Sequence, residues 1–413
     1  MTRVLAVLPR IPFPAVSGGE KRVLALIEGL SSRYEFSLMT LLPSEDPRAA
    51  AAAALHLEGR WFTRVRLIPR GPAPSSERRL AVPDYARWYY DPAFEQALRD
   101  AVRRDGADLV HLEFAEMGQY VRVAAEAAPS VFTQHDAGLV SLTRSHLKRG
   151  YRWYDWRRYW QWRCRRADAR LALNHADRAV ALSDADARRL SRLGGRGRVR
   201  GVPTGVDLRH FAFHGSEGRD RSWAVFLGHY PHYPNEDAAL FLCRDILPRL
   251  RRLRPGVRIV LAGSSPTPDI SALAGESVWV PGTQPDIRPF LMKAGVFLAP
   301  LRLGFGIKGK ILEAMAAGAP VVATPQSLEA FPGLEDGRHV LIGRSARELA
   351  QKAACILADP GRAAALGEAA RAYVEERFGW DRQIGLLDQV FREAIEEGRL
   401  RLRAARDGEA AQR

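Results

Sequence analysis

The sequence lacks long apolar runs and is poor in cysteine. No stretch of the 413 residues approaches the ~20 consecutive apolar residues that a membrane-spanning helix needs. The three cysteines, Cys164, Cys243 and Cys355, have no metal-ligand spacing, and their odd number leaves one unpaired in any disulfide scheme. Arg10 and several prolines interrupt the apolar start of the chain, unlike a signal peptide. We therefore expect a cytoplasmic protein, at most peripheral at the inner membrane surface.

Acidic residues are outnumbered as well. The chain has 62 Lys and Arg residues against 47 Asp and Glu residues, a formal net charge of +15. Such a charge attracts nucleic acid, an anionic membrane or a polyphosphate ligand, and it does not choose among them.

What the sequence does contain is a regular alternation of strand-like and helix-like segments, which predicts parallel sheets covered by helices on both faces. A chain of this length exceeds one compact core, so we expect two Rossmann-like α/β domains. The predicted divisions are a first domain at 1–203, joined by a C-terminal helix at 381–400, a turn-rich linker at 204–221, a second domain at 222–380, and a flexible basic tail at 401–413.

The segment 296–324 is the most informative. A buried strand ends at Pro300, a glycine-rich loop carries Gly304 and Gly306, and a helix begins close to Lys310. Glycines let the backbone approach a ligand, and a helix N-terminus offers free N–H groups, so this loop suits a diphosphate. Lys308 and Lys310 add charge, and Glu313 could accept two hydroxyl hydrogen bonds from a ribose. The alternative is an ordinary strand, turn and tightly packed helix.

The sequence GIKGKILEAMAAGAPVVAT, which begins at Gly306, resembles the donor-site motif of GT-B glycosyltransferases in the large retaining group called family 4. The similarity extends to PTGVD at 203–207, FLG at 226–228, HYPNEDA at 232–238, VPGTQPDIRPFL at 280–291 and FGW at 378–380. This resemblance implies two Rossmann-like domains facing each other across a cleft, with the donor bound mainly by the second. It implies transfer from a nucleoside diphosphate sugar to a hydroxyl acceptor with retained configuration, in polysaccharide or glycoconjugate synthesis.

The resemblance also assigns site residues. His135, at the end of VFTQHD, would lie beside the transferred sugar, and Lys308 would stabilise the departing diphosphate, so these two are the expected catalytic residues. The remaining expected donor-binding residues are Gly18, Gly19, Gly228, Gly282, Gly304, Phe305, Gly306, Ile307, Lys310 and Glu313. A plain loop at Gly18 and Gly19, and a structural role for His135, are the alternative interpretations.

Two positions depart from the family pattern. The family commonly has a second glutamate eight positions before the first, whereas Phe305 stands there here. The usual Arg and Lys pair after the first strand of the second domain is replaced by His229 and Asn235. We expect no metal, because no Asp-x-Asp motif stands out at a strand end, and no cofactor other than the donor itself.

The segment 144–170, from Arg144 to Arg170, is unusually basic and aromatic. It holds ten Arg or Lys residues against two Asp, a net of +8, with four tryptophans and three tyrosines. Trp153, Trp156 and Trp160 fall on one helical face, which suits docking on an anionic membrane. Stacking on nucleic-acid bases and a helix whose tryptophans face the core are the other interpretations, and we do not expect nucleic acid as a partner.

Three other functions remain as alternatives. A dinucleotide-dependent oxidoreductase would need a G-x-G-x-x-G turn after the first strand, where the sequence instead reads PRIPFPAVSGG. A nucleotide-sugar epimerase would share the fold. A non-catalytic basic module that binds a membrane or nucleic acid would carry a degenerate sugar site.

Overall fold

The computed structural model describes residues 1–15, 17–42, 46–70, 88–135, 155–213, 215–304 and 306–411. The chain divides into two compact units, 1–203 with 380–413, and 204–379. Each unit holds one entirely parallel sheet, which confirms the predicted α/β class with two Rossmann-like domains.

The sheet of unit 1 has seven strands in the order β3-β2-β1-β4-β5-β6-β7. Its strands are β1 (Thr2–Leu8), β2 (Tyr34–Leu41), β3 (Arg64–Ile68), β4 (Leu109–Glu113), β5 (Ser130–Gln134), β6 (Arg178–Ala181) and β7 (Val199–Gly201). The helices described in this unit are α1 (Gly18–Leu30), α2 (Pro47–Leu57), α4 (Pro92–Asp105), η2 (Ala115–Tyr120), α5 (Val121–Ala127), α7 (Asp155–His175), α8 (Asp184–Leu193) and α17 (Trp380–Ala411).

Both faces of this sheet are buried, as its sequence pattern predicts. On β1, Leu5 and Val7 pack into the core shared with α4, α5 and α7, whereas Val4 and Ala6 pack into the core shared with α1 and α17. Consecutive residues of a strand point to opposite faces, so a strand covered on both sides reads as a continuous apolar run.

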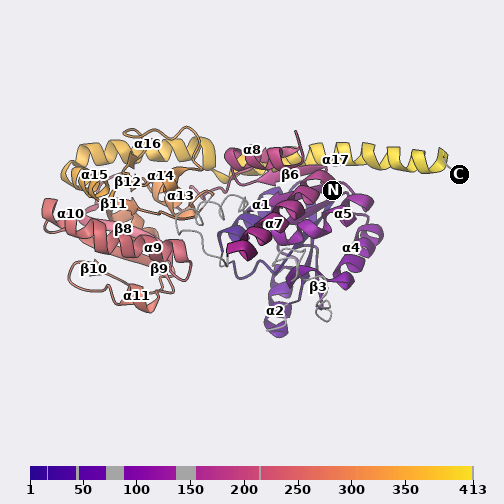
Figure 1. Cartoon of the computed structure of the whole chain (residues 1–413), viewed down its shortest axis with the longest axis horizontal. Coiled ribbons are helices and arrows are strands. Elements are labelled where there is room, and N and C mark those ends of the chain that lie inside the picture. The colour runs from indigo at the N-terminus through magenta and orange to yellow at the C-terminus, as the bar shows by residue number, and fades with distance from the viewer. Residues whose placement is uncertain are drawn as a thin grey trace. The chain divides into compact units, whose positions relative to one another are not determined.

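Helix α17 is the long yellow helix of Figure 1 and packs on unit 1. Its face with Leu387 and Phe391 is buried, and its Asp388 carboxylate accepts hydrogen bonds from Tyr34 Oη at 2.8 Å and Arg33 at 2.7 Å. The segment predicted as a flexible tail, 401–413, is helical as far as Ala411. At the start of this segment, Arg401 pairs with the buried Asp177 at 2.8 Å.

The sheet of unit 2 has six strands in the order β10-β9-β8-β11-β12-β13. Its strands are β8 (Asp220–His229), β9 (Arg258–Ser264), β10 (Val278–Trp279), β11 (Ala294–Ala299), β12 (Val321–Ala323) and β13 (Leu341–Ile342). The helices described in this unit are α9 (Tyr233–Phe241), η3 (Leu242–Ile246), α10 (Leu247–Leu253), α11 (Pro268–Ser271), α12 (Arg288–Lys293), α13 (Gly309–Ala316), α14 (Pro325–Leu328), α15 (Ala346–Ala358) and α16 (Pro360–Phe378).

The predicted linker at 204–221 is part of unit 2 rather than a free connection. Val206 bridges to Gly379, and β8 already begins at Asp220. Arg219 holds this segment in place by donating to the carbonyls of Leu291, Met292, Ala294 and Ala317. Burial lowers the pKa of Arg219 to about 10. The sequence of this segment does not predict these contacts, because the carbonyl groups that Arg219 binds lie about 70 to 100 residues further along the chain, as with Leu291 and Ala317.

Candidate functional site

The glycine-rich loop of unit 2 lies between β11 and α13. Gly304 and Gly306 have φ values of 93° and 70°, a left-handed backbone that side chains disfavour. Lys308 is the N-cap residue of α13, and the space that a Cβ on Gly304 would fill lies 3.3 Å from its Nζ atom. The loop therefore places a lysine and the positive end of a helix at one point, as an anion site requires.

Further basic groups surround this loop. His232 precedes α9, and burial first, then the charges of Lys310 and Lys308 and the neighbouring His229, lower the pKa of His232. His229 itself ends β8 and shares a 3.0 Å hydrogen bond between its Nδ1 atom and Ser264 Oγ. Four basic side chains thus influence one another where β8 and β11 end.

Lys310, which the sequence predicts to bind the donor, is bonded within unit 2. Its ammonium donates a 2.6 Å hydrogen bond to Asn235 Oδ1 and lies 4.5 Å from the centre of the Phe226 ring. Burial is the main cause that lowers the pKa of Lys310 to about 7; Lys308 adds to it and Glu313 opposes it. Asn235 also donates 2.8 Å to the carbonyl of His229, so it joins the two segments. In the sequence, Asn235 was noted only because it stands where the family has a basic residue. The signal for its structural role was a polar amide in the first turn of a helix.

The other predicted donor residues of unit 2 lie as follows. Gly228 is the penultimate residue of β8, where a Cβ on Gly263 of the next strand would come within 2.0 Å of its carbonyl oxygen. Gly282 has a φ of 81° in the turn after β10. Ile307 packs against the apolar core, and Glu313 is half-buried on α13. Phe305 lies outside the described residues.

In unit 1, Gly18 and Gly19 begin α1. Ser17 and Glu20 close the helix start with a reciprocal capping box, and Arg10 binds the Glu20 carboxylate at 2.9 Å. A Cβ at Gly19 would lie 2.8 Å from Phe114 Cε1 and 3.2 Å from His135 Nδ1, whereas one at Gly18 would meet nothing within 4 Å. Gly19 therefore packs closely against the Phe114 and His135 rings, where a side chain would not fit.

His135 belongs to a buried cluster that the sequence did not reveal. Its ring stacks on Phe114, with centroids 3.9 Å apart, and its Nε2 atom is hydrogen-bonded to Glu113 Oε2. The other Glu113 oxygen lies 3.3 Å from His111 Nε2 and 3.5 Å from Arg22 Nη1. The acidic residue at the end of the apolar β4 was the one signal in the sequence that could have pointed to this cluster.

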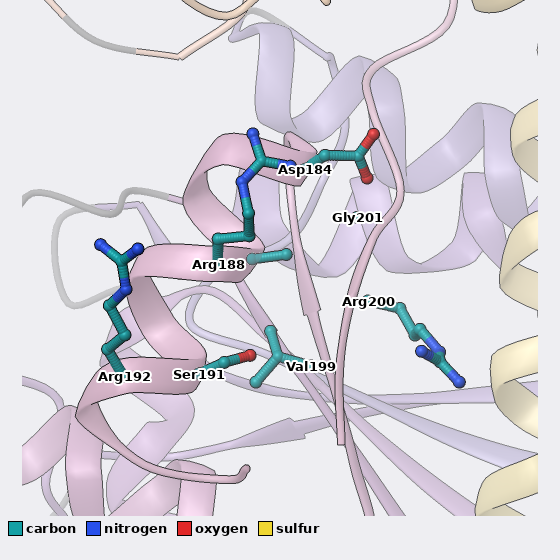
Figure 2. Close-up of a pocket in the computed structure, with 8 residues that line it drawn as sticks. Asp184, Arg188, Ser191, Arg192, Val199, Arg200 and Gly201 are labelled. Carbon is teal, nitrogen blue, oxygen red and sulfur yellow. The ribbon is translucent and has the colours of Figure 1, made fainter. Parts of the chain in front are cut away.

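A hollow of about 360 Å³ lies between α8 and β7 in unit 1. Figure 2 shows the guanidinium groups of Arg188, Arg192 and Arg200 pointing in different directions around it. An Asp-x-Asp sequence lies here, at Asp184 and Asp186, but Asp186 accepts hydrogen bonds from Ser183 Oγ and Arg189 within the first turn of α8. No group of three or more His, Cys, Asp or Glu side chains suited to a metal ion occurs within the described ranges.

The basic aromatic segment is described from Asp155 onward, so Trp153 lies outside the described residues. The C-terminal half of α7 packs inward through Ala172 and Leu173, which are almost fully buried. Its N-terminal half instead exposes Trp156, Tyr159 and Trp160, at 60%, 56% and 43% of their surfaces. The interpretation that these tryptophans face the core is therefore wrong for Trp156 and Trp160. None of the helices in the described part is long and apolar enough to cross a membrane.

Two parallel α/β units, with a glycine loop and lysine before a helix in the second, define a GT-B glycosyltransferase. A family model described as Glycosyltransferase Family 4 matches residues 16–210, and one described as Glycosyl transferases group 1 matches residues 221–359. The chain belongs to this family of glycosyltransferase enzymes.

The chain is 29% identical over 252 residues to the D-inositol 3-phosphate glycosyltransferase of Mycobacterium avium (strain 104). This match covers 54% of the chain and 57% of that relative, so the chain spans little more than half the length of the curated relative.

Solved structures share the fold. The sucrose-phosphate synthase of Thermosynechococcus elongatus matches with a TM-score of 0.68 and 20% identity over 95% of this chain and 98% of that one. Anabaena HepE, in complex with UDP and glucose, matches with a TM-score of 0.64 and 16% identity over 95% and 100%. S. aureus TarM, in complex with UDP and α-GlcNAc-glycerol among others, matches with a TM-score of 0.64 and 8% identity over the same shares.

Proposed function

We propose that the enzyme transfers a sugar from a nucleoside diphosphate sugar to a hydroxyl acceptor. Unit 2 holds the donor: Lys308 and the start of α13 bind the diphosphate, and Glu313 accepts hydrogen bonds from the ribose. The observation that carries this proposal is the Lys308 ammonium beside the left-handed Gly304, at a helix N-terminus. The solved relatives that bind UDP and UDP-glucose make uridine nucleotides the first ligands to test.

The reaction proceeds without a metal and with retention of configuration in this proposal. A departing diphosphate needs positive charge where its negative charge develops, and preorganised lysines and helix N–H groups supply it. Lys308 provides a full charge at the loop, and His232 is close enough for its ionisation to respond to Lys308 and Lys310. Retention rests on the family resemblance, and the anomeric configuration of the product, read by NMR, tests it.

Calorimetric titration with UDP, GDP, ADP and TDP in EDTA tests the donor site. Lys308→Met is expected to weaken the best-binding nucleotide about 10-fold or more, because it removes a charge from the diphosphate. Lys293→Met is a matched control in the same unit, since the Lys293 ammonium lies 5.9 Å from the Trp223 ring. Equal affinity in wild type and Lys308→Met would overturn the assignment of this loop.

Product analysis separates the remaining alternatives. A transferase releases nucleoside diphosphate, and an epimerase converts one sugar nucleotide into another without an acceptor. A non-catalytic module produces neither change with any donor. We propose a sugar or lipid-linked hydroxyl acceptor in polysaccharide or glycoconjugate synthesis.

We further propose that α7 docks on an anionic membrane, where such acceptors lie. Exposed Trp and Tyr rings suit the headgroup region, and the arginines of this helix suit lipid phosphates. Flotation with vesicles containing phosphatidylglycerol tests this, with Trp156→Ala expected to reduce the bound fraction. Trp88→Ala is the matched control, because Trp88 in unit 1 is 69% exposed, against 60% for Trp156, but lies outside α7. Equal loss in both variants would contradict docking through α7.

A further inference from the structure

The carboxylate of Glu113 lies at the end of β4, where three side-chain nitrogen atoms surround it. Arg22 Nη1 and His111 Nε2 lie 3.5 Å and 3.3 Å from Oε1, and His135 Nε2 is bonded to Oε2. Arg22 is fully buried, so its charge is balanced by Glu113 rather than by solvent. Thr133 provides a second partner, 2.8 Å from His111 Nε2.

Burial and neighbouring charges together set the pKa values of Glu113 and His111 in this cluster. Burial alone would raise the pKa of Glu113, but His111, His135 and Arg22 lower it to about 2. Burial also lowers the pKa of His111 to about 4, so that histidine is neutral at physiological pH. Glu113 is therefore an anion that only accepts hydrogen bonds, and His135 must be the donor in its bond to Glu113.

A neutral imidazole carries its proton on one nitrogen, and the other nitrogen then accepts hydrogen bonds. With its proton on Nε2, His135 presents the lone pair of Nδ1. That atom lies 3.2 Å from the place that a Cβ on Gly19 would occupy. The ring cannot turn freely, since it stacks on Phe114 at 3.9 Å.

We infer that Glu113 is a positioning residue, which holds His135 with its proton on Nε2 and so leaves Nδ1 as the acceptor for a sugar hydroxyl. This inference rests on the proposed function for its substrate. It also specifies the ligand chemistry, because an unprotonated nitrogen accepts from a hydroxyl and disfavours an anion.

Tautomer measurement tests the inference directly. We expect the 15N spectrum of histidine-labelled enzyme at pH 8 to show His135 protonated on Nε2 only, with His135→Ala identifying its signals. Glu113→Gln is expected to give a mixture of both tautomers, because an amide can donate as well as accept. The matched control is His111→Gln, which replaces the neighbour of the other Glu113 oxygen. In this variant we expect His135 to remain protonated on Nε2.

Kinetics provide the second readout. Glu113→Gln is expected to lower kcat about 10- to 100-fold, the size of effect that carboxylates supporting metal-bound histidines have, with a smaller change in KM for the donor. If Glu113 acts through His135, the double variant with His135→Ala loses no more activity than His135→Ala alone. Multiplied losses, or an unchanged tautomer in Glu113→Gln, would overturn the inference. The spectra need no substrate, so they decide the role of Glu113 even if no donor is turned over.

Discussion

The half-buried Lys310 side chain allows a quantitative prediction about stability and pH. The pKa of Lys310 falls from 10.5 to about 7 in the folded enzyme, mainly through burial. Between these values the unfolded chain binds one proton more than the folded chain, so the stabilising effect of Lys310 grows as pH rises. Below pH 7 both states hold the proton, and the cost of burying the charge is fully present.

Replacing the amine removes this dependence. Lys310→Met has similar length and no ionisable group, so the free energy of unfolding of wild type minus that of the variant isolates Lys310. From the two pKa values, this difference should become more favourable to the wild type by about 3 kcal/mol between pH 7 and pH 9.5.

Urea unfolding of the full chain at several pH values measures the difference, with hydrogen exchange of peptides from β8 and β11 reporting unit 2 alone. Asn235→Ala is the control: it removes the 2.6 Å partner of the ammonium but keeps the buried amine. That variant should lose stability by about 1 kcal/mol and still show the pH dependence relative to Lys310→Met. A difference that stays constant with pH would refute the reasoning.

Three further outcomes are expected. Binding of a nucleoside diphosphate near pH 7.5 should take up protons, because a nearby dianion favours the charged form of Lys310. Calorimetry in buffers of different ionisation enthalpy measures this proton uptake. Binding without proton uptake would contradict the prediction. Gly19→Ala should reduce activity at least 10-fold because its Cβ would lie 2.8 Å from a ring carbon, whereas Gly18→Ala should be tolerated; equal kcat/KM values would be the contrary result. Arg219→Ala should destabilise unit 2 by about 3 kcal/mol in urea unfolding, since four carbonyls lose a charged donor; an unchanged midpoint would exclude that role.

Much of the fold could be predicted from local patterns. Apolar runs such as 296–299 and 321–324 correspond to β11 and β12, because buried parallel strands need apolar residues on both faces. The short strand β7 and the continuation of α17 to Ala411 escaped prediction. Both depend on partners far away in the chain: Ala179 and Val180 pair with β7, and Asp177 binds Arg401.

The candidate site divides in the same way. The loop of unit 2 could be found because its glycines, lysines and helix follow one another in sequence. The cluster around Glu113 could not, because it joins residues from α1, β4 and the end of β5. Lys310 shows a second reason: sequence gives the charge of a side chain but not its direction, and this ammonium is bonded to Asn235.

Nucleotide release from a panel of nucleoside diphosphate sugars, measured with EDTA present, tests the central claim most directly. Wild type should release nucleoside diphosphate from one preferred donor, and both Lys308→Met and Glu313→Ala should slow that release at least 10-fold. Release that neither variant changes would show that the loop before α13 does not hold the donor. No release from any donor, with or without metal, would contradict the proposed nucleotide-sugar reaction.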